Sequence, residues 1–243
     1  PRAVVANATR DWMLLETMPA NQYFGAFTSD PFTARQEEVH QKAAAYIGCA
    51  KDELYLTPST TISLNMVADG LVSSGFLSQG DHVLTTDQEH AGGYVGWTHY
   101  ATCTPNLTSH DWPCSKPNRS TSDLITLDIL PVPVTPISAA PKTVADILAL
   151  FSAALKRQPR TKVVALSHVT TTHGLAFPVA ELATLVHSHG ALLVVDGAQA
   201  MGLDVNVTKL GVDAYATSAH KWMLAPKGSG LLFVRKDVQR FIT

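Results

Sequence analysis

Two neighbouring stretches of this chain decide how it is expected to fold, LLVVDGAQ (residues 192–199) and DAYATSAHKW (residues 213–222). Each holds an apolar run that stops at polar residues, with Asp196 directly after the first run and Lys221 just beyond the second. Short uninterrupted apolar runs are typical of strands that are buried on both faces of a parallel sheet. Asp196 and Lys221 are therefore expected at the carboxyl ends of two such strands.

Strands and helices alternate along most of the chain. The expected strands cover residues 53–57, 81–85, 162–167, 191–195, 214–217 and 230–235. The expected helices cover residues 33–46, 60–74, 88–101, 144–156 and 179–187, and the hydroxyl side chains of PSTT (residues 58–61) cap the second of these helices. This alternation predicts an α/β fold of three layers, a mainly parallel sheet with helices on both faces. Ligands of such sheets bind at the carboxyl ends of the strands.

Composition and charge narrow the class of protein. With 243 residues, of which 46% are hydrophobic, the chain can bury one sizeable core. A formal charge of −2 and the lack of any lysine or arginine run exclude a nucleic-acid or anionic-membrane partner and favour a small-molecule substrate. The longest apolar stretches, such as residues 190–195, are far shorter than the ~20 residues of a membrane span. No signal peptide is recognisable, so a cytoplasmic location is expected.

Residues 102–141 differ in character from the rest, because they are rich in proline, serine, threonine and asparagine. This composition predicts a surface loop inserted into the domain, with one strand at residues 124–134. The chain begins at Pro1 and ends at Thr243, just after an expected strand. We therefore expect residues 1–243 to form a single large domain that is incomplete at both ends.

Asp196, Gln199 and Lys221 together have the chemistry needed to hold pyridoxal phosphate. A carboxylate keeps the ring nitrogen protonated, an amide can donate to the phenolate oxygen of the ring, and a lysine amine can condense with the aldehyde. Taken singly, these residues have more ordinary interpretations, since an aspartate after a strand often caps a helix and most lysines are surface charges. Their common setting after buried strands favours the cofactor site.

The phosphate of such a cofactor needs several donors, which hydroxyl groups, an imidazole and the amides of a helix start can supply. The candidates are Thr60, Thr61, Ser218 and His220. His90, within EHAGG (residues 89–93), follows an expected strand and could stack on the ring and shuttle protons. Thr171 follows a further expected strand, so five separate loops would contribute to one site.

These segments together resemble the class V aminotransferases, pyridoxal-phosphate enzymes of fold type I that include cysteine desulfurases, selenocysteine lyases and an isopenicillin N epimerase-like group. The resemblance runs from about Phe32 to Val234 and leaves out the proline-rich loop. Its most specific parts are DGAQ (residues 196–199), SAHK (residues 218–221) and PKGSGLL (residues 226–232).

The resemblance implies the large domain of a fold type I enzyme, with Lys221 bound to the cofactor aldehyde, Asp196 on the ring nitrogen and Gln199 on the ring oxygen. It also implies His90 stacked over the ring. The implied phosphate ligands are Thr60, Thr61, Ser218 and His220. Family members act on amino acids, carry a smaller C-terminal domain and form homodimers, so a homodimer is implied, whereas that small domain is not expected within these residues.

Departures from the family pattern bear on the reaction. Desulfurases usually carry an asparagine in the segment that matches SHVTTTHG (residues 167–174), whereas this chain has Thr171, as the epimerase-like and C–S lyase-like members do. None of the three cysteines lies where a persulfide carrier is expected. We therefore expect a C–S lyase or an epimerase. A cysteine desulfurase, an aminotransferase and a catalytically incomplete cofactor-binding fragment remain as alternatives.

Other catalytic classes lack their motifs in this sequence. There is no G-x-G-x-x-G after a strand, no G-x-x-x-x-G-K-[ST] and no G-x-S-x-G. His187 and His189 do not form the H-E-x-x-H pattern of a zinc peptidase, so no metal site is expected.

Overall fold

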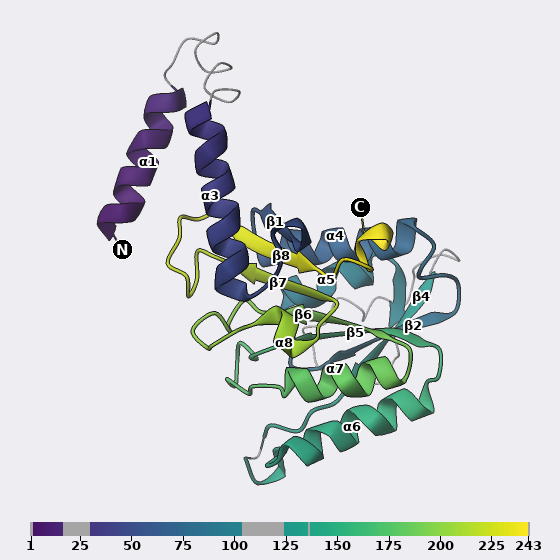
Figure 1. The fold of residues 1–243 in the computed structure, drawn as a ribbon. Coiled ribbons are helices and arrows are strands. Elements are labelled where there is room, and N and C mark those ends of the chain that lie inside the picture. Colours follow the sequence, from purple (N-terminus) through teal and green to yellow (C-terminus); the bar gives the residue numbers. More distant parts are fainter. Residues whose placement is uncertain (1, 17–29, 104–123, 136, 243) are drawn as a thin grey trace.

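The computed structural model describes residues 2–16, 30–103, 124–135 and 137–242, and in them eight strands form one sheet in the order β1-β8-β7-β6-β5-β2-β4-β3 (Figure 1). The strands are β1 (Leu54–Thr57), β2 (Asp81–Thr86), β3 (Ala101–Cys103), β4 (Ile125–Leu130), β5 (Thr161–Ser167), β6 (Leu192–Asp196), β7 (Ala214–Ser218) and β8 (Gly230–Val234). Only β8 runs against its neighbours β1 and β7, and the remaining pairs are parallel. The expected mainly parallel sheet is confirmed.

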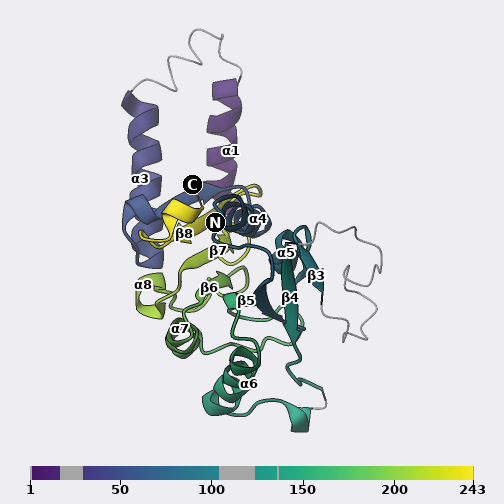
Figure 2. The same cartoon turned by 90° about the vertical axis from the view of Figure 1, so that its right-hand side faces the viewer.

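Helices cover both faces of this sheet, as Figures 1 and 2 show. On one face lie α4 (Thr60–Ser73) and α5 (Ala91–Thr98), and on the other lie α6 (Val144–Arg157), α7 (Val179–Ser188) and the short α8 (Val207–Leu210). The helices α1 (Arg2–Glu16) and α3 (Asp30–Ile47) lie at one end of the sheet, and α1 lies farther from the sheet than α3 does (Figure 1). Three 3-10 turns complete the described elements: η1 (Lys51–Glu53), η3 (Ile137–Ala139) and η4 (Gln239–Phe241).

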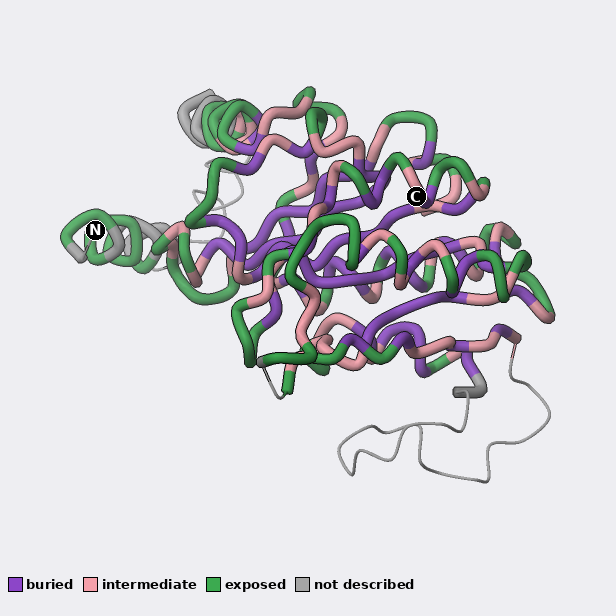
Figure 3. The backbone as a smooth tube through the Cα atoms, turned by 90° about the horizontal axis from the view of Figure 1, so that it is seen from below, coloured by how far each residue is buried: buried purple, intermediate pink, exposed green. Residues whose placement is uncertain are grey.

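Each face of the sheet has its own apolar core. Trp97 and Leu71 are fully buried between the sheet and the α4/α5 layer. Phe151 and Leu182 are fully buried on the opposite face, under α6 and α7. The strands between the two cores are buried along most of their length (Figure 3), which explains why their sequences read as continuous apolar runs. No described helix has the length and hydropathy of a membrane span.

The strand expected at residues 124–134, within the segment 102–141, is confirmed as β4, but it is not part of a surface loop. It pairs in parallel with both β2 and β3 and therefore lies inside the sheet. Ile125, Leu127 and Leu130 are buried, because this strand packs between two neighbours rather than over the surface. Residues 104–123, which hold Cys114 and half of the segment 102–141, lie outside the described residues.

The helix expected at residues 88–101 is shorter in the structure. It begins at Ala91, and β3 begins at Ala101. Residues before Ala91 are not helical, because the Gln88 amide donates to Thr86 Oγ1 at 3.2 Å and Thr86 Oγ1 in turn donates to Glu89 Oε1 at 2.6 Å. Such side-chain bonds compete with the helical pattern and delay its start.

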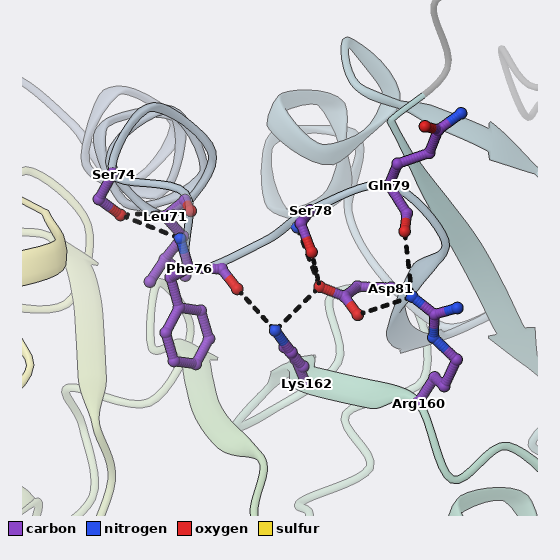
Figure 4. A network of polar contacts seen from close by, with 8 residues as sticks. All are labelled: Leu71, Ser74, Phe76, Ser78, Gln79, Asp81, Arg160 and Lys162. Atoms are coloured by element: carbon purple, nitrogen blue, oxygen red, sulfur yellow. Dashed lines mark hydrogen bonds and ion pairs between the residues drawn. The ribbon is translucent and has the colours of Figure 1, made fainter.

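A polar network closes the edge of the sheet where the parallel strands begin (Figure 4). Asp81, at the start of β2, accepts hydrogen bonds on Oδ2 from Ser78 N and Ser78 Oγ, both at 2.9 Å. Lys162 Nζ lies 3.0 Å from the same oxygen, and the Arg160 guanidinium lies 3.3 Å from Oδ1. Burial alone would raise the pKa of Asp81, but the bonds from Ser78 and Lys162 outweigh it and lower the pKa from 3.8 to about 2.

Replacing Asp81 by asparagine is expected to lower the free energy of unfolding at pH 7 by about 1–3 kcal/mol, because Ser78, Lys162 and Arg160 lose a buried, charged acceptor. The folded-state pKa lies below the unfolded value, so this contribution is present above about pH 4 and is lost as the pH falls toward about 2. The difference between Asp81→Asn and the unaltered protein should therefore narrow between pH 5 and pH 3 in urea titrations. The exposed Asp204→Asn serves as the control, and equal midpoints at pH 7 for Asp81→Asn would contradict the prediction.

Candidate active site

The carboxyl ends of the parallel strands meet at the opposite edge of the sheet, and the start of β8 joins them there. Gly230 pairs with Thr57 at the end of β1 and with Ser218 at the end of β7. In the next strands, Asp196 ends β6 opposite Ser167, which ends β5. The loops that leave these ends carry the residues singled out from the sequence.

Thr60 and Ser218 are in direct contact, although 158 positions separate them in the chain. The amide of Thr60 donates to Ser218 Oγ at 3.0 Å, and the two hydroxyl oxygens lie 2.7 Å apart. Thr60 occupies this place because Ser59 caps α4, accepting from Ile62 N at 3.3 Å. Both residues are buried, so the start of α4 and the end of β7 form one cluster of hydroxyl and amide donors.

The start of α5 lies against the start of α4. His90 is the N-cap residue of α5, and its Nδ1 accepts from Gly92 N at 3.1 Å. A Cβ atom on Gly92 would overlap Thr61 Oγ1, so only glycine permits this close approach. His90 and Thr61 are consequently brought to the same place from separate loops, and His90 remains exposed to a ligand.

Asp196 is the buried carboxylate of the site, with 7% of its surface exposed. Its Oδ1 accepts from Ala198 N at 2.8 Å, whereas Oδ2 has no hydrogen-bond partner among the described residues. Burial raises the pKa of Asp196, and the charges of Lys221 and His90 partly oppose that rise, so both groups lie within electrostatic range of the carboxylate. A Cβ atom on Gly93 would come within 3.1 Å of Oδ2, which shows how closely α5 approaches it.

Lys221 lies in the turn after β7, where its backbone amide donates to Ser218 O at 3.2 Å. Its neighbour His220 points Nδ1 at the carbonyl oxygen of Ser229, 3.2 Å away. Because a carbonyl only accepts, that nitrogen carries a proton, and Nε2 is the ring atom left to face a ligand. On the other side of Lys221, the Trp222 indole N–H donates to Gln199 Oε1 at 2.8 Å.

Thr171 has no described contact with the other candidates. It lies in the exposed turn after β5, while its neighbour Thr170 is buried and accepts from Leu175 N at 3.0 Å on Oγ1. Thr171 therefore stands at the same edge of the sheet as the other candidates, without a described partner within the site.

Glu89 was not predicted from the sequence as a member of the site. Its Oε1 accepts from Thr86 Oγ1 at 2.6 Å and its Oε2 from Ser167 Oγ at 2.5 Å. Part of the residue stays at the surface, but the carboxyl group is enclosed, and this burial raises its pKa from 4.5 to about 7, to which the nearby charge of Asp196 adds. The only signal in the sequence is that Glu89 directly precedes His90.

His168 and Tyr215 form a buried pair that supports the loop after Asp196. The Tyr215 hydroxyl and His168 Nδ1 lie 2.9 Å apart, with the two rings edge to face. A Cβ atom on Gly197 would overlap the Tyr215 ring, so glycine is required directly after Asp196. Burial raises the pKa of Tyr215 and lowers the pKa of His168, so both side chains are uncharged at neutral pH.

This set of groups fits an aromatic ligand that carries a phosphate. Asp196 is a buried residue whose Oδ2 has no described hydrogen-bond partner, so this oxygen can accept from a protonated ring nitrogen. The Thr60 and Ser218 cluster supplies uncharged donors at the start of a helix, which suits a phosphate. Lys221 brings an amine within electrostatic range of Asp196.

The fold and this edge define an α/β enzyme domain whose ligand site lies at the carboxyl ends of parallel strands. A profile of the family described as Aminotransferase class-V matches residues 12–116 and 132–243. The chain belongs to this family.

Named relatives and solved structures agree with this assignment. Isopenicillin N epimerase of Amycolatopsis lactamdurans is 30% identical over 198 residues, which are 81% of this chain and 43% of that protein. A cysteine desulfurase of Klebsiella pneumoniae subsp. pneumoniae is 30% identical over 85% of this chain and 44% of its own length. The apo structure of a cysteine desulfurase from Thermococcus onnurineus NA1 is 27% identical, with a TM-score of 0.64 over 86% of this chain and 45% of that chain. The chain thus spans less than half the length of these relatives.

Proposed function

We propose that this chain is the cofactor-binding part of a pyridoxal-phosphate enzyme that acts at the α-carbon of an amino acid, as a C–S lyase or an epimerase. The observation that carries the proposal is the buried Asp196, whose Oδ2 has no described hydrogen-bond partner. Lys221 lies within electrostatic range of this carboxylate, and its backbone amide bonds Ser218, which also contacts Thr60. Membership of the class V family supports the choice of cofactor.

Each end of the cofactor has a protein group suited to it. Asp196 would hold a proton on the ring nitrogen, and Gln199 would donate to the ring oxygen. The amides and hydroxyls at the start of α4, with Ser218 and the Nε2 of His220, would hold the phosphate. When bound, the cofactor supplies an electron sink for bonds broken at the α-carbon of the substrate.

Lys221 and His90 are the groups that move protons. Lys221 would hold the cofactor through its aldehyde, and the amine of Lys221 would be the base for the α-proton of a bound amino acid. His90, exposed at the start of α5, would cover one face of the ring and could carry protons to or from the substrate. Returning the proton on the other face gives an epimer, and expelling a sulfur group from the side chain gives a lyase product.

Sulfur transfer through a persulfide is less well supported, although several relatives are named cysteine desulfurases. Such a reaction needs a cysteine that is readily ionised. Burial, together with the charge of Glu53, raises the pKa of Cys49 to about 11. Cys103 and Cys114 have no described side chains. The threonine at position 171, in place of the asparagine expected in desulfurases, also favours the lyase or epimerase.

The finer proposals follow the family pattern. We expect a homodimer in which the partner subunit completes the phosphate pocket, and a cytoplasmic location. We also propose that residues 1–243 belong to the large domain. The alternative is a chain that binds the cofactor without turnover.

The test is a substrate screen of the chain loaded with pyridoxal phosphate. Cysteine, cysteine sulfoxide conjugates and alanine are offered, and pyruvate, sulfide and racemisation are scored. We expect pyruvate from the sulfur compounds or racemisation of alanine. Visible absorbance on adding the cofactor, but no exchange of the α-proton from any amino acid, would favour the binding-only fragment over the enzyme. An absence of visible absorbance would refute both.

A further inference from the structure

The hydrogen bond between Trp222 and Gln199 is the feature that the proposed reaction does not explain. Trp222 directly follows Lys221, and Gln199 lies three positions after Asp196. The Trp222 Nε1 to Gln199 Oε1 distance of 2.8 Å therefore joins the two loops that hold the two ends of the proposed cofactor. Among the described residues, this is the one side-chain hydrogen bond that joins residues 197–203 to residues 219–225.

The chemistry of the indole decides how the Gln199 amide is turned. An indole N–H can only donate, so the amide atom that faces it must be the oxygen. The amide oxygen and nitrogen diverge from one carbon, and Nε2 is accordingly turned away from the indole. Among the described residues Gln199 Nε2 has no partner, so its two N–H groups are left for a ligand.

The loop that carries Trp222 is held in a defined conformation. The Leu224 amide donates to Lys221 O at 3.2 Å, and the Ala225 amide donates to Ala219 O at 3.0 Å. Leu224 adopts a φ of 57°, a left-handed conformation that a branched side chain tolerates only where its surroundings impose it. The indole also lies against the turn after β6, since a Cβ atom on Gly202 would be 3.8 Å from its Cε3.

We propose that Trp222 is a positioning residue that orients the Gln199 amide so that its N–H groups face the ring oxygen of the cofactor. The inference rests on the proposed function and adds a residue that itself touches neither cofactor nor substrate. Without the indole, the Gln199 side chain would sample both amide orientations. In one of them the amide oxygen would face the anionic ring oxygen of the cofactor. The indole removes that orientation.

The test is a pH titration of the visible absorbance of the cofactor-loaded chain. A hydrogen bond to the ring oxygen favours its anionic form, so weakening that bond lets the chromophore keep its proton to a higher pH. Trp222→Phe retains the ring over Gly202 but removes the donor. We expect it to raise the titration midpoint by roughly 0.3 to 1 pH unit, because the indole is 57% exposed and water competes for the bond.

Three further variants make the result specific. Gln199→Leu removes the amide and should raise the midpoint at least as far as Trp222→Phe does. The double variant should match Gln199→Leu alone, because the indole acts only through that amide. Leu224→Ala, an exposed side chain of the same loop, should leave the midpoint unchanged.

The outcomes separate this inference from the proposed function. If Trp222→Phe titrates as the unaltered chain does while Gln199→Leu is shifted, or if the two shifts add in the double variant, Trp222 does not orient Gln199. If the unaltered chain gives no visible absorbance with pyridoxal phosphate, the proposed function itself is wrong, and this inference with it.

Discussion

Lys221→Ala is expected to abolish the visible absorbance that the chain develops with pyridoxal phosphate, and to lower turnover of the best amino acid by roughly 10²–10⁴-fold or more. In the proposed mechanism the amine at this position would serve twice, as the covalent anchor of the aldehyde and as the base for the α-proton. Its place in the turn after β7, within electrostatic range of the buried Asp196, suits both tasks. Absorbance spectra and initial rates of the two proteins measure the effect.

A control separates this effect from a general loss of positive charge. Lys209, in the short helix α8, is exposed and stands outside the proposed site, so Lys209→Ala should keep both the absorbance and the rate. If Lys221→Ala still forms product at the rate of the unaltered chain, the chemistry assigned to this lysine is wrong.

Glu89→Gln is expected to remove a pH dependence of stability that reaches up to about 3 kcal/mol between about pH 4.5 and about pH 7. Burial raises the pKa of Glu89 from 4.5 to about 7, so between these values the folded protein binds a proton that the unfolded chain has released. Stability from this group is therefore present at low pH and is lost as the pH rises. Glutamine stays neutral throughout and can still bond Thr86 and Ser167.

The measurement compares urea unfolding of the cofactor-free proteins from pH 5 to pH 8. The free energy of unfolding of Glu89→Gln, relative to that of the unaltered protein, should increase as the pH rises. The difference between the two proteins should be smallest near pH 5. Glu181→Gln makes the same chemical change at an exposed position at the start of α7, and its curve should follow that of the unaltered protein. Parallel curves for Glu89→Gln and the unaltered chain would mean that the Glu89 carboxylate is charged at neutral pH.

The fold could be predicted largely from local patterns. The runs of apolar residues at 162–167 and 191–195 became β5 and β6 within one residue at their ends, because a strand covered on both faces can carry little else. The serine and threonine residues before α4 also predicted its start correctly, since Ser59 is the cap. The strand β4 was expected at residues 124–134, but it was assigned to a surface loop, because the composition reflects the loops around it while its place inside the sheet depends on pairing with β2 and β3.

The candidate site could be predicted in part. Asp196, Lys221, Thr60, Ser218 and His90 stand out because strand ends and helix starts are visible in the sequence, and the structure brings these residues to one edge of the sheet. Thr171 gained no contact with them. Glu89 was overlooked, because an acidic residue in a turn looks like a solvated charge until Ser167, 78 positions away, is seen to bond it.

By itself the sequence determined the alternation of strands and helices, the edge of the sheet at which we propose that a ligand binds, and the types of group that would hold it. These features depend on residues close together in the chain, through the periodicity of apolar side chains and the preferences of helix ends. Only the tertiary structure decided that Glu89 is enclosed beside Asp196 and that Trp222 bonds Gln199. Burial and amide orientation depend on neighbours that are distant in sequence, and no local pattern encodes them.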